Sequence, residues 1–570
     1  MKIVGLNHDM FISSAALVED GQITAAAAEE RFLRQKHTRK FPHHSLDYCL
    51  EAGNIDIQDV DVFVSSWNPG VYLESFNPLI SDNRRLKAEY LYSIPDNIFR
   101  HLPEGQSTVD RLQQKFVLND REIEVSYVTH HRAHAANGYF PSPFDEAAIL
   151  TADSQGEKEA ITFSRGQGHL IELLQAQNHP HSLGVLYSTI TEYLGFRANS
   201  DEWKVMAVAA NSDTKNQFDR VLEENLVNFL DTGRIELDLS YFTGHLPDQG
   251  GFYSNKLIEI LGPPRVGGSP LTERHIEIAG ALQRLAEKAT WHLLAHLHRL
   301  VRSVNLAVSG GFFMNSVING KIAENSPFEN VFVSSCPDDS GNAIGAALYH
   351  YHHISGNPHR SEMTHNFFGP AFDQDQIAKS INQVGLEFAL LEDAETHTAK
   401  LLADGKIVGW FQGHMEFGQR ALGNRSILAD PRDPSMKDRL NAKIKFRENF
   451  RPFAPAVLSE RATDYFEMGS INQIPFMEKV IPVRPEMRPK LPAITHYDGS
   501  ARVQTVDQRS SPKFHNLISR FQSITGVPIL LNTSFNLNGE PIVCTPDDAI
   551  RAFYSCGMDA LVIGNCLIEK

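Results

Sequence analysis

The feature that most constrains the fold is a recurring alternation between short apolar runs and helical patterns over the first 355 residues. Polar turns such as Glu19-Asp20-Gly21 separate the earliest runs, and turns of this kind favour β-hairpins. Later runs end in polar or glycine-rich turns that lead into helical patterns. The sequence therefore predicts an α/β fold that opens with a β-meander. The predicted strands lie at residues 3–6, 15–18, 23–28, 60–65, 146–152, 306–308 and 331–334.

Length and composition are those of an ordinary globular protein. At 570 residues the chain is long enough for two to four domains, with 42% hydrophobic and 21% charged residues. No apolar run is long enough to span a bilayer, and the first residues do not read as a secretory signal. The five cysteines include no CxxC pair, which argues for a reducing compartment. We therefore expect a cytoplasmic protein with no membrane partner.

The formal net charge of −16 constrains the partners. A negative surface disfavours RNA and DNA, whose phosphates require a basic face. It suits a cationic small molecule, because an acidic surface attracts positive ligands. The same charge also serves solubility, so by itself it identifies no ligand. It predicts only that nucleic acid is not a partner.

A change of pattern divides the chain. Residues 356–370 are polar and rich in loop-forming types, and strand and helix patterns restart beyond them. The predicted organisation is a first domain at 1–355, a linker at 356–370 and a second domain at 371–570.

A metal site is predicted in the first domain. His130 and His134 lie one turn apart on a predicted helix, which is the spacing of metal ligands. Two histidines at this spacing are also common as core or surface residues, so the pair is a weak signal alone. Asp153 and Asp338 each follow a buried strand, where ligands gather in α/β sheets, and Asp339 is a rival for Asp338. Two histidines with one or two aspartates suit iron, manganese or zinc.

Nucleotide contacts are predicted at turns that follow strands. The strand at 306–308 runs into Ser309-Gly310-Gly311, with Asn315 beyond, and such a turn lets phosphate approach the backbone. It is not a Walker A loop. Asn7-His8-Asp9 and Asp153-Ser154-Gln155-Gly156 are two more turns, one in each of two similar lobes, as in an actin-like ATPase fold. Ordinary hairpin turns explain these two equally well.

An anion site is predicted in the second domain. The segment 443–455 places four cations within nine residues and surrounds them with aromatic residues and proline. Arginine forks match phosphate or carboxylate, and lysine adds a point charge. Surface salt bridges are the alternative, which the apolar neighbours weaken. Asn532 and Ser534 add neutral hydrogen-bonding groups after an apolar strand. The cations of the predicted site are Lys443, Lys445, Arg447 and Arg451, with Arg420 and Arg502 from neighbouring segments.

These motifs together resemble the O-carbamoyltransferases of nodulation-factor and antibiotic biosynthesis. The resemblance extends over nearly the whole chain and is most specific in its later motifs. The sequence departs from the pattern of the family at Ser154-Gln155, after Asp153, and at Gln419. These departures concern individual phosphate contacts and leave the implied reaction class unchanged. The matching stretches are 7–9, 29–32, 130–134, 187–196, 204–206, 309–315, 415–428, 443–455 and 498–506.

The resemblance implies a two-lobed, actin-like ATPase domain similar to the tRNA threonylcarbamoyl-transfer protein, with bound Fe²⁺. It also implies a C-terminal α/β domain of the threonylcarbamoyl-adenylate-synthase type. Mg²⁺, Mn²⁺ and Zn²⁺ are alternatives to iron. Within the family, the chain is most similar to members that carbamoylate aminoglycosides such as tobramycin and kanamycin. A homodimer is compatible with this expectation.

The activity implied is ATP-dependent transfer of a carbamoyl group from carbamoyl phosphate through carbamoyl-adenylate. The cations would hold carbamoyl phosphate, with Asn532 and Ser534 receiving the carbamoyl group. Ser309, Gly310, Gly311, Asn315, Ser154, Gly156 and Asp338 would contact the nucleotide. The general base is left open among His8, Asp9 and His131.

Competing interpretations remain. Threonylcarbamoyl transfer to tRNA needs the same fold, but the net negative charge argues against it. A hydrogenase-maturation enzyme would need paired-cysteine zinc fingers, which the sequence lacks. A non-enzymatic nucleotide-gated clamp leaves the histidine pair and the C-terminal cations unexplained. A sugar kinase rests on fold alone, which is poor evidence of function.

Overall fold

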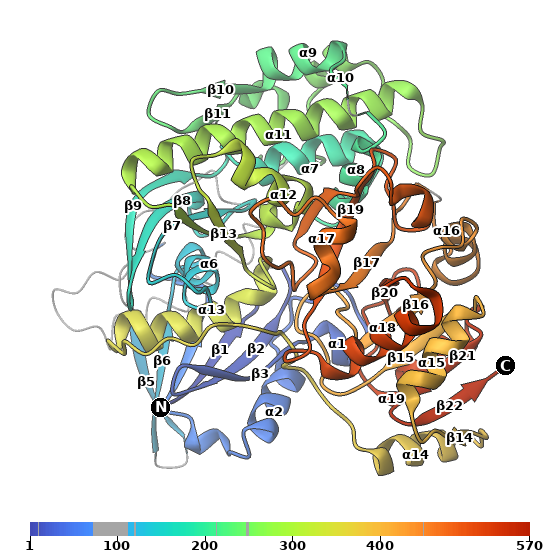
Figure 1. Cartoon of the computed structure of the whole chain (residues 1–570). Helices are drawn as coiled ribbons and strands as arrows, with labels where there is room; N and C mark the ends of the chain where they lie inside the picture. Colours follow the sequence, from blue (N-terminus) through green and yellow to red (C-terminus); the bar gives the residue numbers. More distant parts are fainter. Residues whose placement is uncertain (10, 72–111, 119–120, 213, 247–249, 449) are drawn as a thin grey trace. The chain divides into compact units, whose positions relative to one another are not determined.

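The computed structural model describes residues 1–9, 11–71, 112–118, 121–212, 214–246, 250–448 and 450–570. The chain divides into two compact units (Figure 1). Unit 1 comprises Met1–Thr24 and Cys49–Glu362, and unit 2 comprises Ala25–Tyr48 and Met363–Lys570. The later boundary falls inside the segment expected to be a linker. The early excursion of Ala25–Tyr48 into unit 2 differs from the sequence-based expectation, which left those residues in the first domain.

Unit 1 contains two mixed sheets. The first has the order β3-β2-β1-β4-β6-β5 and the second has the order β13-β12-β7-β8-β9. The strands of the first sheet are β1 Lys2–Asn7, β2 Ser14–Glu19, β3 Gln22–Ala28, β4 Val62–Ser65, β5 Leu112–Leu118 and β6 Arg121–Tyr127. The strands of the second sheet are β7 Glu146–Ala152, β8 Glu159–Gln167, β9 Leu170–Asn178, β12 Asn305–Ser309 and β13 Asn330–Val333.

The two sheets repeat one topology. In the first, β1 pairs antiparallel with β2 and parallel with β4, and β4 pairs parallel with β6. In the second, β7 pairs antiparallel with β8 and parallel with β12, and β12 pairs parallel with β13. A hairpin on one side of the first strand and parallel strands on the other, present twice, is the actin-like arrangement. The predicted α/β class and two-lobed actin-like fold are therefore confirmed for unit 1.

Two helices pack between these sheets. Helix α13 (Asn342–Tyr349) packs on β1 and β2, helix α6 (His130–Tyr139) packs on β7 and β12, and the two helices pack on each other. Glycine permits this close approach, because a Cβ on Gly345 would overlap the carbonyl oxygen of Ala133. Likewise, a Cβ on Gly5 would overlap the carbonyl oxygen of Ala343. The polypeptide backbones thus set the separation between the layers.

The remaining elements of unit 1 lie on the side of the second sheet that α11 covers (Figure 1). Helix α11 spans 28 residues. These elements are α7 Leu183–Tyr193, α8 Glu202–Ala209, α9 Gln217–Leu226, α10 Asn255–Leu261, α11 Glu273–Leu300, α12 Ser316–Asn325, β10 Val227–Phe229 and β11 Ile235–Leu237.

Unit 2 is built on a nine-stranded sheet with the order β14-β22-β21-β15-β16-β20-β17-β19-β18. The strands are β14 Ala389–Leu390, β15 Val408–Phe411, β16 Arg425–Ala429, β17 Ala454–Leu458, β18 Lys479–Pro482, β19 Ser500–Val506, β20 Ile529–Ser534, β21 Ala560–Ile563 and β22 Cys566–Glu569. The helices that cover it are α14 Gln374–Gln383, α15 Ala394–Ala403, α18 Pro512–Thr525 and α19 Pro546–Tyr554, with shorter α16 Met436–Leu440 and α17 Ala462–Tyr465.

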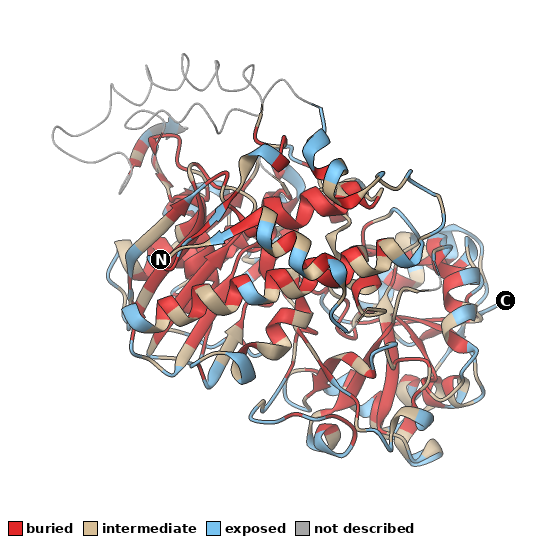
Figure 2. Ribbon diagram, turned by 90° about the horizontal axis from the view of Figure 1, so that it is seen from above, coloured by how far each residue is buried: buried red, intermediate tan, exposed pale blue. Residues whose placement is uncertain are grey.

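Both faces of this sheet are buried (Figure 2). Successive residues of a strand point to opposite faces, and Leu530 and Leu531 of β20 accordingly belong to different apolar clusters. One cluster includes residues of α14 and α19, and the other includes residues of α15 and α18. Unit 2 is therefore a three-layer α/β domain, in accord with the predicted class. No helix among the described residues is long and apolar enough to cross a membrane.

The segment Ala25–Tyr48, with α1 (Glu30–Leu33) and the start of α2 (His43–Ala52), is tied into unit 2 by buried polar contacts. The Arg31 guanidinium donates to the carbonyl oxygen of Gly418 at 2.6 Å. Arg34 donates to the carbonyl oxygens of Ile542 and Pro541 at 2.7 and 2.8 Å. Glu29 is buried and accepts from the Ser45 amide and hydroxyl, both at 2.9 Å. These contacts explain why a stretch of the N-terminal region belongs to the C-terminal unit.

We predict that Gly5→Ala destabilises the protein. The added methyl would overlap the Ala343 carbonyl oxygen and push α13 away from β1, at a cost of about 2–3 kcal/mol for overpacking. Chemical denaturation followed by circular dichroism measures the change. Gly267→Ala is the matched control, because its Cβ would meet only the Gly195 oxygen at 3.4 Å. Equal stability of the two variants would contradict the prediction.

Candidate metal and anion sites

A cluster of four metal-binding side chains lies in unit 1. His130 and His134 come from α6, Asp153 follows β7, and Asp339 begins the short helix η5 (Asp339–Gly341). One ligand atom from each lies within 4.8 Å of all the others. The two Nε2 atoms are 3.1 Å apart, and Asp153 Oδ2 lies 3.0 Å from His134 Nε2. Asp339 Oδ1 lies 3.6 and 3.5 Å from the two Nε2 atoms.

The cluster corrects one predicted ligand. Asp339, the rival, faces the histidines, whereas Asp338 does not belong to the cluster. Asp338 is the N-cap of η5, and its Oδ1 accepts from the Ser340 amide at 3.2 Å and from the Ser340 hydroxyl at 2.5 Å. The Cys336 thiol also donates to this oxygen at 3.2 Å. The capping of its own turn thus directs the Asp338 carboxylate away from the rings.

The geometry fits a divalent metal ion. Ligand bonds of about 2.0–2.2 Å place neighbouring donors roughly 3–3.5 Å apart, as found here. Burial alone would raise the pKa of Asp153, but hydrogen bonds from His130 and His134 hold it well below its usual range. Burial would lower the pKa of His134, but Asp153 and Asp339 outweigh it and raise this pKa to about 9. Two imidazoles and two carboxylates suit iron, manganese or zinc.

Neighbouring side chains hold the metal-binding helix without joining the cluster. His131 points elsewhere, because its Nδ1 lies 2.7 Å from the Thr151 hydroxyl. Glu157, which directly follows the predicted turn Asp153-Ser154-Gln155-Gly156, is fully buried and accepts from the His130 amide at 3.0 Å and from the Asn68 amide at 2.7 Å. Burial raises the pKa of Glu157 to about 7. Its carboxylate caps the first turn of α6, where the N-cap Thr129 makes no side-chain hydrogen bond.

The predicted glycine turn adjoins the metal cluster. Gly310 has φ +106°, and a Cβ there would overlap the Ala152 carbonyl oxygen. The Gly311 amide donates to Asp153 Oδ2 at 3.2 Å, which joins the turn to a metal ligand. Ser309 Oγ lies 3.4 Å from His134 Nδ1. Asn315 is buried and caps α12 through the Ile318 amide at 3.1 Å.

The other predicted contacts of unit 1 lie in two turns. His8 Nδ1 lies 2.6 Å from Asp9 Oδ2 in the turn after β1. Ser154 donates its amide to Asp153 Oδ1 at 2.6 Å. A Cβ on Gly156 would come within 2.9 Å of the His131 ring, so this position favours glycine. Roles for these residues in binding nucleotide stay predictions.

The predicted cations gather in unit 2. Burial lowers the pKa of Arg502 well below its usual range, and the charges of Arg420 and Arg447 lower it further. Burial, followed by the charge of Arg451, lowers the pKa of Arg447 to about 9. Arg451 has a carboxylate near it, with Glu448 Oε2 at 3.6 Å. Repulsion among these half-buried arginines marks a place where a bound anion would be stabilised.

The two lysines of the segment differ in position. Lys445 is buried, and its Nζ donates to the Ser534 carbonyl at 2.5 Å and to Asn536 Oδ1 at 2.8 Å. Lys443 is exposed, and its backbone oxygen accepts from the Gly557 amide at 3.0 Å. Burial, followed by the charges of Arg447, Arg451 and Lys36, lowers the pKa of Lys445. Lys445, rather than Lys443, therefore lies inside the cationic cluster.

The neutral residues predicted beside the cations are on β20. The Asn532 side chain is buried and donates to the Ala421 carbonyl and to Gln504 Oε1, both at 3.1 Å. The Ser534 hydroxyl donates to Asn536 Oδ1 at 2.7 Å. These bonds fix Asn532 and Ser534 within the sheet on the strand end that Lys445 contacts.

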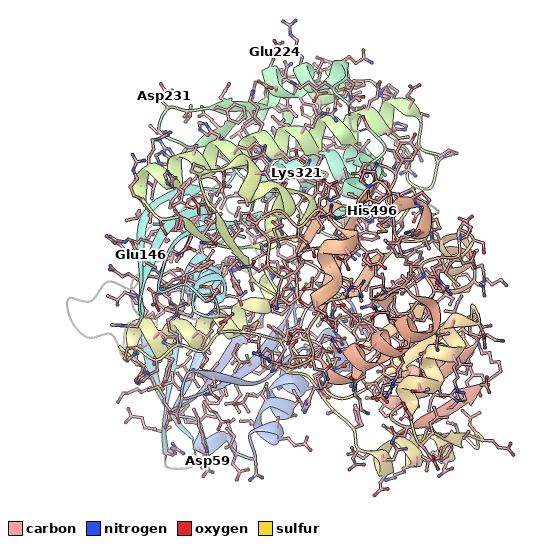
Figure 3. The ribbon with its side chains drawn as sticks, viewed as in Figure 1. Asp59, Glu146, Glu224, Asp231, Lys321 and His496 are labelled. Atoms are coloured by element: carbon pink, nitrogen blue, oxygen red, sulfur yellow. The ribbon has the colours of Figure 1, made fainter. Side chains whose placement is uncertain are left out.

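Sequence reasoning missed three residues around these cations. The charge of Lys36, from the segment Ala25–Tyr48, acts on Lys445, and the charge of Arg447 acts on Lys437. His496, labelled in Figure 3, has its Nδ1 3.1 Å from the Ser500 hydroxyl. Burial lowers the pKa of His496 to about 4, helped by Arg502 and Lys437 and opposed by Asp498. The charged run at 34–40 was the available signal for Lys36.

The family models identify the class of protein. The carbamoyltransferase N-terminus model matches residues 2–348, and the carbamoyltransferase C-terminus model matches residues 399–570. The chain belongs to the carbamoyltransferase family, and the resemblance found in its motifs is confirmed.

Relatives cover nearly the whole chain. Uncharacterized protein sll1178 of Synechocystis is 37% identical over 100% of this chain and 96% of that protein. Nodulation protein NolNO of Sinorhizobium fredii is 36% identical over 99% of this chain and 80% of that protein. Nodulation protein U of Rhizobium tropici is 30% identical over 95% of this chain and 91% of that protein.

Solved structures show more distant similarity. The activator of 2-hydroxyisocaproyl-CoA dehydratase from Clostridium difficile aligns with a TM-score of 0.31 and 13% identity, over 62% of this chain and 94% of that one. HypF of T. kodakarensis aligns with a TM-score of 0.31 and 12% identity, over 63% of this chain and 48% of that one.

We predict that His130→Ala removes the metal. Loss of one imidazole leaves three ligands and opens a buried polar cavity, so metal content after purification should fall from about one ion per chain to near zero. Elemental analysis measures it. His131→Ala is the matched control, because it removes the adjacent buried imidazole but leaves the cluster intact. Full metal content in His130→Ala would exclude this ligand set.

Proposed function

We propose that the protein is an ATP-dependent O-carbamoyltransferase that uses carbamoyl phosphate and passes through carbamoyl-adenylate. One observation supports this above others: a carbamoyltransferase-family chain carries both a metal-binding cluster joined to a glycine turn and a separate buried cluster of cations. The first suits a nucleotide and the second suits an acyl phosphate. Two chemically distinct sites are what two sequential activation steps require.

In unit 2, the cations would hold the phosphate of carbamoyl phosphate. Arg447, Arg451 and Arg502 compensate the dianion and the charge that develops as its P–O bond to the carbamoyl group breaks. Water supplies the oxygen that phosphorus gains, so the products are phosphate and carbamate. Arg420 would complete the phosphate contacts, whereas Lys443 is exposed and lies outside the cationic cluster. Asn532 and Ser534 would face the carbamoyl group. Lys445 fixes the strand end that carries Ser534.

In unit 1, carbamate would attack the α-phosphorus of ATP. The new bond forms between a carbamate oxygen and phosphorus, and pyrophosphate leaves. The backbone of Gly310 and Gly311 lets phosphate oxygens come close, with Ser309, Asn315, Ser154 and Gly156 around the nucleotide. A metal ion held by His130, His134, Asp153 and Asp339 would supply Lewis-acid polarisation of oxygen.

The transfer step needs a base for the acceptor hydroxyl. The hydroxyl oxygen attacks the carbamoyl carbon, its proton passes to the base, and AMP leaves. Of the three candidates, His8 has the geometry of an oriented base, because Asp9 Oδ2 lies 2.6 Å from its Nδ1 and can fix the orientation of the ring. His131 is less suited, because burial lowers its pKa well below the usual range. We therefore assign the base to His8, with Asp9 orienting it.

For the acceptor we propose an aminoglycoside such as tobramycin or kanamycin. The net charge of −16 favours a polycationic sugar. The relatives named as nodulation proteins make a different sugar acceptor the second candidate. The negative charge argues against tRNA as the acceptor. For either sugar acceptor the donor half of the reaction would be the same.

We predict that Arg451→Ala separates the two half-reactions. Release of phosphate from carbamoyl phosphate should fall at least about 100-fold, because the half-buried positive charge of Arg451 beside the dianion is lost, whereas transfer from supplied carbamoyl-adenylate should persist. Phosphate release and product mass measure the two halves. Arg461→Ala is the matched control, since Arg461 is on the surface of the same unit and pairs with Asp464 at 2.7 Å. If Arg451→Ala retains both half-reactions, the cation cluster is not the site that binds carbamoyl phosphate.

The acceptor is tested directly. The protein is incubated with ATP, carbamoyl phosphate and a panel of aminoglycosides, neutral oligosaccharides and tRNA, and the products are weighed. We expect one aminoglycoside to gain a single carbamoyl group. If only an oligosaccharide gains a carbamoyl group, the acceptor is a neutral sugar instead of an aminoglycoside, and the proposed reaction still holds. A gain only on tRNA would overturn the proposed acceptor altogether.

A further inference from the structure

Asn342 places its side-chain amide against both metal-binding histidines. It is the first residue of α13 and is fully buried. Its Nδ2 lies 3.1 Å from His134 Nε2 and 3.3 Å from His130 Nδ1. Its Oδ1 is buried and has no hydrogen-bond partner among the described residues. No feature of the sequence had singled out this residue.

Metal binding fixes which ring nitrogens carry protons. The two Nε2 atoms face each other and the carboxylates, so these are the atoms that would bind an ion. A neutral imidazole bound through Nε2 carries its proton on Nδ1 and needs an acceptor there. For His134 that acceptor is Ser309 Oγ, 3.4 Å from its Nδ1. For His130, the group facing Nδ1 among the described residues is the amide of Asn342.

An amide nitrogen cannot accept that proton. With Nδ2 toward His130, two donors would oppose each other once the ring binds metal, while the Oδ1 acceptor of the same amide would stay unused. The two ends of a side-chain amide are nearly equal in shape, so a half-turn about the Cβ–Cγ bond exchanges them with little movement of neighbours. The exchange would place Oδ1 where His130 needs it.

We propose that Asn342 is a positioning residue of the metal site, whose amide oxygen accepts the Nδ1 proton of His130 when metal binds. This inference rests on the proposed metal site. Asn342 acts through His130, since it holds the ring in the tautomer whose Nε2 lone pair points at the ion. The close approach of α6 and α13 keeps the amide against the rings, and Gly345 permits that approach because a Cβ there would overlap the Ala133 carbonyl oxygen.

Two substitutions of equal shape test the polarity of this contact. Asn342→Asp keeps an oxygen acceptor and removes the donor, whereas Asn342→Leu removes both. Co²⁺ is the probe, and its affinity is measured by competition with a chromophoric chelator in the full-length protein. We expect Asn342→Leu to weaken Co²⁺ binding roughly 10- to 100-fold, and Asn342→Asp to bind Co²⁺ at least as tightly as the native protein. Asn319→Leu is the matched control, as Asn319 is also buried but donates to the Phe313 carbonyl.

A spectroscopic reading separates positioning from general loss of stability. In the Co²⁺ protein, the Nδ1 protons of His130 and His134 should give two exchangeable, hyperfine-shifted NMR resonances. We expect both in the native protein and in Asn342→Asp, and only one in Asn342→Leu, because the unbonded proton exchanges with water. If Asn342→Leu does not fold, the Co²⁺ affinity of Asn342→Asp still tests the inference. Loss of Co²⁺ affinity in Asn342→Asp would show that the amide hydrogens are needed and would overturn the inference.

His130→Ala distinguishes this inference from the metal site on which it rests. If His130→Ala binds Co²⁺ as tightly as the native protein, the ligand set itself is wrong. If His130→Ala loses Co²⁺ but Asn342→Leu keeps native affinity and both resonances, only the role of Asn342 is refuted.

Discussion

The contact between α6 and α13 is the constraint on which the rest of unit 1 depends. Each helix covers a different sheet, and glycines at positions 5 and 345 let backbone touch backbone along this stack. The contact brings the start of α13, with Asp339 and Asn342 near it, to the two histidines of α6. Residues some 200 positions apart in sequence therefore share one site. A larger side chain at either glycine would change the distance between metal ligands as well as the packing.

Each unit gathers charged side chains away from water, but the two clusters attract ligands of opposite charge. In unit 1, buried carboxylates surround imidazoles, and this arrangement attracts a cation. In unit 2, half-buried guanidinium groups lower one another's pKa, and this arrangement attracts an anion. In each case the cost of burying charge is lowered when the ligand arrives. The net charge of the chain obscures the second site, because the cations form a minority of charged residues gathered in one place.

The sequence predicted the features that depend on local spacing. The structure brings the histidine pair and the aspartate after β7 into one cluster and puts the glycine turn beside it, since helix periodicity and strand ends determine these positions. Their roles in binding metal and nucleotide stay predictions. The choice between Asp338 and Asp339 was not predictable, because one residue of capping geometry decides which carboxylate faces the rings. Lys445 rather than Lys443 is buried because the segment Asn441–Lys445 forms a π-helical turn, whose wider period shifts the inward-facing position. Periodicity of an ordinary helix cannot anticipate that shift.

The excursion of Ala25–Tyr48 into unit 2 has a consequence for how the chain can be divided. A fragment of residues 363–570 alone would lack Arg31 and Arg34, so the carbonyl groups of Gly418, Ile542 and Pro541 would lose these donors. It would also lack Lys36, whose charge acts on Lys445. A cut at one point near residue 363 therefore does not yield a whole unit 2, and a complete unit requires residues 25–48 as well as 363–570.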